Sequence, residues 1–491
     1  MTLTLFELSA LLLVATGAFG WLNQRFVHLP HTIGLLVMGL AASLLLVCVE
    51  LAFPDRQLHE ALTGILRQVD FSAALLDGML AFLLFAGALN VDIAALRERV
   101  WAVGAMATAG VLISTVVVAT GFWMAGQALG SPVPWAWALV FGALISPTDP
   151  VAVLGTLREV EVPGSLQLDL SGESLFNDGV GVVVFMALLG IAQGQHGIDL
   201  GEIGRLFALE VLGGAALGLA TGYLAYRAMH AIDDYSVEVL ISLGLVAGTY
   251  ALADRLHLSG PIAVVVAGLL IGNRGPRYAF SDLTRRYLCG FWTLLDEMLN
   301  AVLFLLIGLE VLVLRFDASF AWVLVVAVPL ALAARLAAVS VPVLALGRWQ
   351  GFAAGTIPVM TWGGLRGGIS VALALALPET EAKAVILAAT YTVVVFSLVV
   401  QGLTLARVVA WATPEASEAG SRSWRAAAMR TARSCSSAGS SMCRRPAPSI
   451  IARWLRIARR CASVRTVGAS LPRMSASSIR IAGWLCAAWR I

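Results

Sequence analysis

Apolar runs of about 20 residues recur along most of the chain and constrain its fold more than any other feature. Hydrophobic residues make up 59% of the 491 residues and charged residues 13%, whereas soluble domains carry about 25% charged residues. Such runs cross a bilayer as helices, because backbone N–H and C=O groups have no water to bond there and must bond each other. The sequence predicts an all-α polytopic membrane protein with about thirteen transmembrane helices, at residues 3–22, 31–50, 71–91, 101–126, 134–158, 166–192, 206–231, 236–254, 260–273, 288–313, 320–346, 351–377 and 382–411.

The loops indicate an orientation in the membrane. Loops after odd-numbered spans hold ten basic residues, and loops after even-numbered spans hold six. Basic residues concentrate in cytoplasmic loops. We expect a multi-pass protein of the cell (inner) membrane, with the N-terminus outside and the C-terminus in the cytoplasm. No cleavable signal peptide is expected, because the first apolar run lacks a basic start.

The chain changes character after residue 412. Residues 413–491 contain fourteen arginines and two acidic residues, and they show no sustained helical or strand period. Two interpretations stay open: a basic tail attracted to anionic lipid, or a stretch read in the wrong frame of a GC-rich gene, which we favour. We predict a transmembrane domain at 1–411 and a basic, disordered or aberrant tail at 413–491, to which we assign no function.

Polar side chains gather in the sixth apolar run, at Glu173, Ser174, Asn177 and Asp178. On a helix, Ser174 and Asp178 share one face, and the other two form a neighbouring stripe. A soluble helix capped by Ser171 would explain the first two residues but not the Asn-Asp pair further inside. Charges at membrane depth are costly and are usually kept for function.

Two other runs contain signals that interrupt a helix. The fifth holds Ser146-Pro147-Thr148-Asp149-Pro150, where the prolines remove backbone donors and disfavour helix at the preceding residues. The alternative there is a loop between two shorter segments. The twelfth places Arg366 among four glycines, from Gly363 to Gly368. Non-helical backbone at membrane depth is tolerated where it is buried or lines a cavity.

The two interrupted spans occupy corresponding places in two three-helix units, at about 101–192 and 320–411. Seven spans separate them, so the units are antiparallel, and this is the inverted-repeat layout of secondary transporters. A charged arginine inside the membrane needs a carboxylate to compensate its charge, and Glu173 and Asp178 are the candidates to pair with Arg366.

Several charged residues lie between these motifs. Asp77 is either a supporting acid of the site or an interfacial residue. Asp296 and Asn300 form an i, i+4 pair, and Arg335 could pair with Glu310. We interpret these last four residues as structural support.

Three motifs together resemble the first monovalent cation:proton antiporter family, the bacterial sodium/proton antiporters related to animal sodium/hydrogen exchangers. They are Ser146-Pro147-Thr148-Asp149-Pro150, Gly172-Glu173-Ser174-Leu175-Phe176-Asn177-Asp178-Gly179 and Gly363-Gly364-Leu365-Arg366-Gly367-Gly368. The resemblance covers residues 1 to about 411. One departure is Ala86, where some members of the family carry a glutamate.

The resemblance implies a homodimer whose protomers combine a mobile core, with two unwound and crossing helices, and a dimerisation domain. It implies that Asp178 binds either a cation or a proton, that Asn177 supports it, and that Ser174 and Thr148 ligate the ion. A sodium site at Asp178, Ser174 and Thr148 follows, with Asp149 included among the ion- and proton-binding residues. A buried pair of Glu173 with Arg366 is also implied.

The implied function is exchange of sodium for protons, and the Asn-Asp form is associated with electroneutral exchange. The hard oxygen ligands of the implied site suit sodium or lithium and do not exclude potassium. No enzyme activity, cofactor or nucleic-acid partner is expected. Two alternatives are a cation-coupled symporter of organic anions on the same fold, and an intramembrane aspartyl protease using Asp149 and Asp178. The Gly-X-Gly-Asp pattern typical of such proteases is absent from this sequence.

Overall fold

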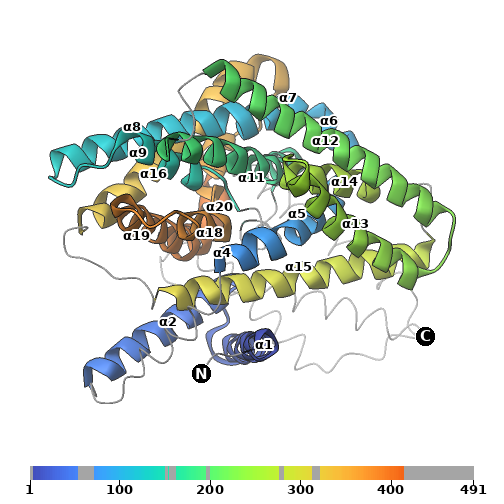
Figure 1. Ribbon diagram of the computed structural model, residues 1–491, viewed down its shortest axis with the longest axis horizontal. Helices are drawn as coiled ribbons and strands as arrows, with labels where there is room; N and C mark the ends of the chain where they lie inside the picture. Colours follow the sequence, from blue (N-terminus) through green and yellow to red (C-terminus); the bar gives the residue numbers. More distant parts are fainter. Residues whose placement is uncertain are drawn as a thin grey trace, which may run out of the picture. The chain divides into compact units, whose positions relative to one another are not determined.

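The computed structural model describes residues 4–52, 71–149, 153, 162–194, 200–275, 281–311 and 321–413. Within these ranges every regular element is helical, which confirms the predicted all-α class (Figure 1). The principal helices are α1 (Leu5–Leu22), α2 (His31–Ala52), α5 (Leu80–Leu89), α8 (Val111–Ala128), α9 (Trp135–Ile145), α11 (Gly164–Ala192), α12 (Leu200–His230), α13 (Tyr235–Arg255), α14 (Gly260–Arg274), α15 (Asp282–Glu310), α16 (Ala321–Gln350), α17 (Thr356–Gly363), α18 (Gly368–Leu375), α19 (Glu381–Phe396) and α20 (Gly402–Ala412).

Short helical segments extend several of these helices. They are the α-helical α4 (Phe71–Ala73), α6 (Ile93–Glu98) and α7 (Val100–Ala105) and the π-helical η1 (Asn23–Val27), η3 (Ala74–Met79), η4 (Met106–Gly110) and η7 (Ser397–Gln401). In the described part of the chain, nine continuous helical stretches are long and apolar enough to cross a membrane, and three shorter apolar helices accompany them. The count of thirteen spans stays a prediction. Of the predicted tail at 413–491, only Thr413 lies within the described residues.

Two apolar clusters hold the helices together. The first unites α8, α9, α16, α18 and α19 with the second half of α11, around Phe122, Phe141 and Phe185. The second unites α5, α12, α13, α14 and α15 around Phe85 and Trp292, whose ring centroids are 4.7 Å apart. Helix α11 contributes to both clusters, so its polar residues lie where the two clusters meet.

Glycines let α2 and α15 approach closely. A Cβ atom added to Gly308 would lie 2.7 Å from the Leu36 carbonyl oxygen, and one added to Gly39 would lie 3.0 Å from that of Leu305. The Ser43 hydroxyl donates a hydrogen bond of 2.9 Å to the Gly308 carbonyl across the same contact. Small residues commonly permit such packing between membrane helices. One face of α15 is thereby fixed to α2.

Candidate functional site

The first predicted interruption begins where α9 ends. The helix stops at Ile145, and residues 146–149 are not helical. Pro147 has no N–H to donate, and Pro150 disfavours helical backbone at Asp149. In the remainder of the predicted span, to residue 158, only Val153 is among the described residues.

The second predicted interruption separates α17 from α18. Helix α17 ends at Gly363 and α18 begins at Gly368, with non-helical backbone at 364–367. A Cβ atom on Gly367 would overlap the Asp149 side chain. Glycine is therefore required here by the close approach of the other interrupted segment.

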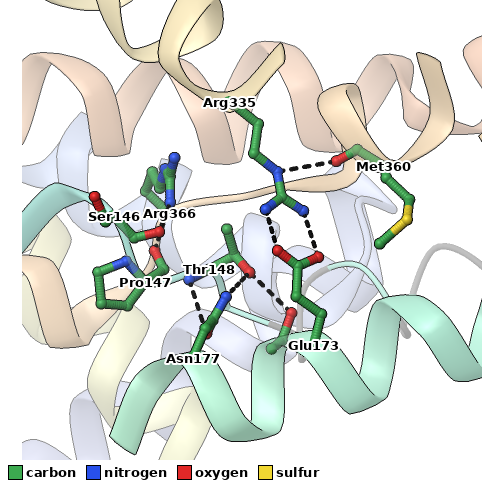
Figure 2. A network of polar contacts seen from close by, with 9 residues as sticks. Ser146, Pro147, Thr148, Glu173, Asn177, Arg335, Met360 and Arg366 are labelled. Carbon is green, nitrogen blue, oxygen red and sulfur yellow. Dashed lines mark hydrogen bonds and ion pairs between the residues drawn. The ribbon is translucent and has the colours of Figure 1, made fainter. Parts of the chain in front are cut away.

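The two interrupted segments cross and bind each other. The Asp149 N–H donates to the Leu365 carbonyl at 2.7 Å, which links the two backbones. Arg366 Nη1 donates to the carbonyl oxygens of Ser146 and Pro147, the latter at 2.8 Å (Figure 2). The predicted pair of unwound, crossing helices is confirmed.

Charge at the crossing matches the helix ends. The last carbonyls of a helix lack intrahelical donors and carry partial negative charge, and the first N–H groups carry partial positive charge. Arg366 binds carbonyls just beyond the end of α9, and the Asp149 side chain lies against Gly367, directly before α18. Each charged side chain therefore sits at a helix end of opposite sign.

Hydrogen bonds join α11 to the first interruption (Figure 2). The Asn177 side chain accepts from the Thr148 N–H at 3.3 Å and donates to Thr148 Oγ1 at 2.8 Å. The hydroxyls of Thr148 and Ser174 are 3.0 Å apart. All three residues are buried. Asn177 thus fixes Thr148 so that two hydroxyl oxygens lie side by side.

Asp178 follows Asn177 on α11 and is 3% exposed. Its carboxylate lies within electrostatic range of Asp149 and Arg366. A Cβ atom on Gly179 would meet Ile262 of α14, and one on Gly181 would meet Pro147 of the interruption. The segment carrying Asp178 is therefore packed between the crossing and α14.

The predicted pairing of Glu173 with Arg366 is wrong. Arg335, on α16, forms a bidentate ion pair with Glu173, in which Arg335 Nη2 donates to Glu173 Oε2 at 2.7 Å (Figure 2). Arg335 Nε also donates to the Met360 carbonyl at 3.1 Å. The suggested Arg335–Glu310 pair is wrong for the same reason. A planar guanidinium matches a carboxylate through two parallel bonds. The Arg366 guanidinium instead donates to the carbonyls of Ser146 and Pro147, just beyond the end of α9.

The remaining predicted residues lie on other helical elements. The Asp296–Asn300 pair is confirmed, since Asn300 Nδ2 donates to Asp296 Oδ1 at 2.9 Å. Ala86 is buried in α5. Asp77 falls in η3, and its side chain is outside what the structure describes.

Sequence reasoning missed a second buried ion pair, between Arg99 and Asp169. The Arg99 Nε donates to Asp169 at 2.9 Å, and its Nη1 donates to the Gln350 carbonyl at 2.7 Å. This hydrogen bonding with Asp169 raises the pKa of Arg99 above its usual value. Asp169 lies four residues before Glu173 on α11, so the two acids share one face of the helix. This spacing is the sequence signal that Asp169 is buried and needs a basic partner.

Comparisons with known proteins agree on one family. The family model described as "Sodium/hydrogen exchanger, transmembrane" matches residues 9–411. The chain is 45% identical over 412 residues to the Na(+)/H(+) antiporter NhaP of Pseudomonas aeruginosa, covering 82% of this chain and 96% of that protein. It is 34% identical to the Na(+)/H(+) antiporter NhaH of Halobacillus dabanensis, covering 80% and 95%.

Solved structures share the fold. The sodium proton antiporter MjNhaP1 from Methanocaldococcus jannaschii superposes with a TM-score of 0.64 at 20% identity, covering 82% of this chain and 97% of that one. This likeness confirms the predicted antiporter fold.

Proposed function

The chain belongs to the sodium/hydrogen exchanger family, and from this premise we propose that it exchanges sodium for protons across a membrane. We further propose that exchange is electroneutral, with one proton for each sodium ion, and that it serves pH and salt homeostasis. Lithium, and potassium by its similar ligand chemistry, are further candidate substrates.

The observation that carries the proposal is the paired hydroxyls of Thr148 and Ser174, held by Asn177 at the crossing. With the Asp178 carboxylate they supply hard oxygen ligands, which suit sodium. We assign the sodium site to Asp178, Ser174 and Thr148. Asn177 positions Thr148, and Asp149 contributes its charge to the same site.

Exchange follows from competition for one carboxylate. A bare carboxylate is costly in a site of low dielectric constant, so Asp178 holds either a proton or a cation. If the empty, charged site crosses the membrane too slowly to matter, only the two loaded forms move. Coupling of sodium to protons then needs no separate relay.

Movement of the site would be carried by the units at 101–192 and 320–411, which contain both interruptions. We propose that these units form a mobile core within the domain at 1–411 and that the protein is a homodimer in the inner membrane. The distribution of basic loop residues supports an outside N-terminus and a cytoplasmic C-terminus.

The symporter alternative depends on Arg366 as the binding residue for an organic anion. Arg366 Nη1 is instead bonded to two carbonyls of the crossing, and the named relatives are Na(+)/H(+) antiporters. We therefore do not carry that alternative further.

Everted membrane vesicles from a host without its own antiporters test the proposal. With the lumen acidified and a pH-sensitive dye present, added sodium should alkalinise the lumen, and Asp178→Asn should abolish the response. Glu297→Gln, which alters an exposed acid on α15, is the control and should respond like the wild type. Full exchange by Asp178→Asn would contradict the assignment.

A further inference from the structure

The buried ion pair of Arg99 with Asp169 has no part in the exchange described above. Arg99 lies between α6 and α7 and is 9% exposed, and Asp169 on α11 is fully buried. Arg99 Nε donates to Asp169 Oδ1 at 2.9 Å, and Arg99 Nη2 makes the second bond of the pair, to Oδ2. A bidentate pair holds its side chains in one geometry, so it fixes the junction of α6 and α7 to α11.

The same guanidinium also binds the end of α16. Its Nη1 donates at 2.7 Å to the carbonyl of Gln350, the last residue of that helix. The last carbonyls of a helix lack intrahelical donors and attract a cation. The guanidinium carbon also lies 5.0 Å from the centroid of the Phe352 ring. Arg99 therefore joins α11 to α16, and these helices belong to different repeated units, 101–192 and 320–411.

The turn after α16 leads from this contact to the crossing. The Gly351 carbonyl accepts a longer bond from Arg99, at 3.4 Å, and Gly351 has a φ of 52°, a left-handed backbone that suits glycine at a helix end. Helix α17 then begins at Thr356 and ends directly before the interruption that holds Arg366. A contact that fixes this turn therefore acts on the helix that leads into the crossing.

On α11, the Arg99 contact lies close to the proposed sodium ligands. Ser174 is five residues after Asp169, about 7.5 Å along the helix axis, and Asp178 is nine residues after it, about 13 Å. Between them, Glu173 pairs with Arg335 of α16. Helix α11 is therefore tied to α16 in two successive turns, once directly and once through Arg99.

We propose that Arg99 is a positioning residue for sodium binding, which holds the two repeated units together as one body at this end of α11. It does not contact the ion. Its bonds to Asp169 and to the Gln350 carbonyl fix α11 relative to the turn before α17. Ser174 and Asp178 then keep their places beside the interrupted segments. This inference rests on the proposed function, because it concerns the same sodium site.

Sodium KM and maximal rate of reconstituted full-length variants test this inference. Arg99→Met keeps much of the side-chain length but removes every bond of the guanidinium. It should raise KM about tenfold, the lower end of the loss expected when a residue that orients a metal ligand is removed. Asp169→Asn should raise KM in the same direction. Arg99→Lys keeps the charge without the planar fork, so its KM should lie between those of the wild type and Arg99→Met.

A destabilised variant separates positioning from folding. Leu245→Ala removes buried apolar volume from the second cluster, on α13, outside both repeated units. It should lower the yield of folded protein, and the folded remainder should have the wild-type KM.

The outcomes separate this inference from the proposed function. A wild-type KM in folded Arg99→Met and Asp169→Asn, with only their yield or thermal stability reduced, would overturn the positioning role. If Arg99→Met does not fold, the KM of Asp169→Asn decides by the same criterion. Absence of exchange by the folded wild type would instead contradict the proposed function.

Discussion

At the scale of single residues, the site depends on how each buried charge is compensated. Glu173 is 2% exposed and is paired with Arg335, which is 4% exposed. Removing one partner of such a pair leaves an uncompensated charge, whereas removing both leaves none. The pair therefore links α16 to α11 and compensates both buried charges, and neither residue is among the ligands proposed for sodium.

Thermal and chemical unfolding of detergent-purified variants tests this pairing. Glu173→Gln and Arg335→Met should each lower the free energy of unfolding by about 3–5 kcal/mol, since each leaves a buried charge. The double variant should lose clearly less than the sum of the two. Additive losses would show that the two side chains do not interact.

The residue types could be predicted from the sequence, but the partner of Glu173 could not. Charges inside apolar runs identified Glu173, Asp178, Arg335 and Arg366 as residues that need compensation. To decide whether Arg335 or Arg366 pairs with Glu173, one must know the rotation of α16 about its axis and the direction of the Arg366 side chain. Neither quantity is encoded in sequence spacing.

At the scale of elements, the two interrupted helices were predicted with their positions. Pro147 and the glycines around Arg366 act on the backbone locally, so the positions of the two interruptions can be predicted from the sequence alone. The Asp149–Leu365 backbone bond depends on packing between distant segments and is visible in the structure.

Substitutions of two glycines test the closeness of the crossing. Gly367→Ala should destabilise the protein by about 1–3 kcal/mol and slow exchange, because the added methyl group overlaps Asp149. Gly347→Ala is the matched control, since a Cβ atom there meets nothing within 4 Å on α16. It should have unchanged exchange and equal or slightly higher stability. Normal exchange and stability in Gly367→Ala would contradict this account of the crossing.

At the scale of the whole molecule, α11 is the helix shared by two apolar clusters, and the site lies at their boundary. The proposed mobile core would move the site relative to the second cluster at this boundary. The sequence indicated the two repeated units through their corresponding interruptions. It could not indicate which helices pack together, because every span is similarly apolar.

A reversible cross-link between α15 and α18 tests this movement. A Cβ atom on Gly368 would lie 2.9 Å from Leu303 Cγ, so cysteines at the two positions are close enough for a disulfide. In a background without the six native cysteines, oxidation of the Leu303→Cys, Gly368→Cys protein should stop exchange. Reductant should restore it. Exchange at the wild-type rate by fully cross-linked protein would contradict a moving core.

The central claim is that one carboxylate, Asp178, is shared by the two ions. Calorimetric titration of purified protein with sodium, repeated in buffers of different ionisation enthalpy, counts the protons released for each sodium ion bound. The account predicts release of close to one proton by the wild type, at a pH where the unloaded site is protonated, and neither binding nor release by Asp178→Asn. Sodium binding without proton release, or binding that persists in Asp178→Asn, would contradict it.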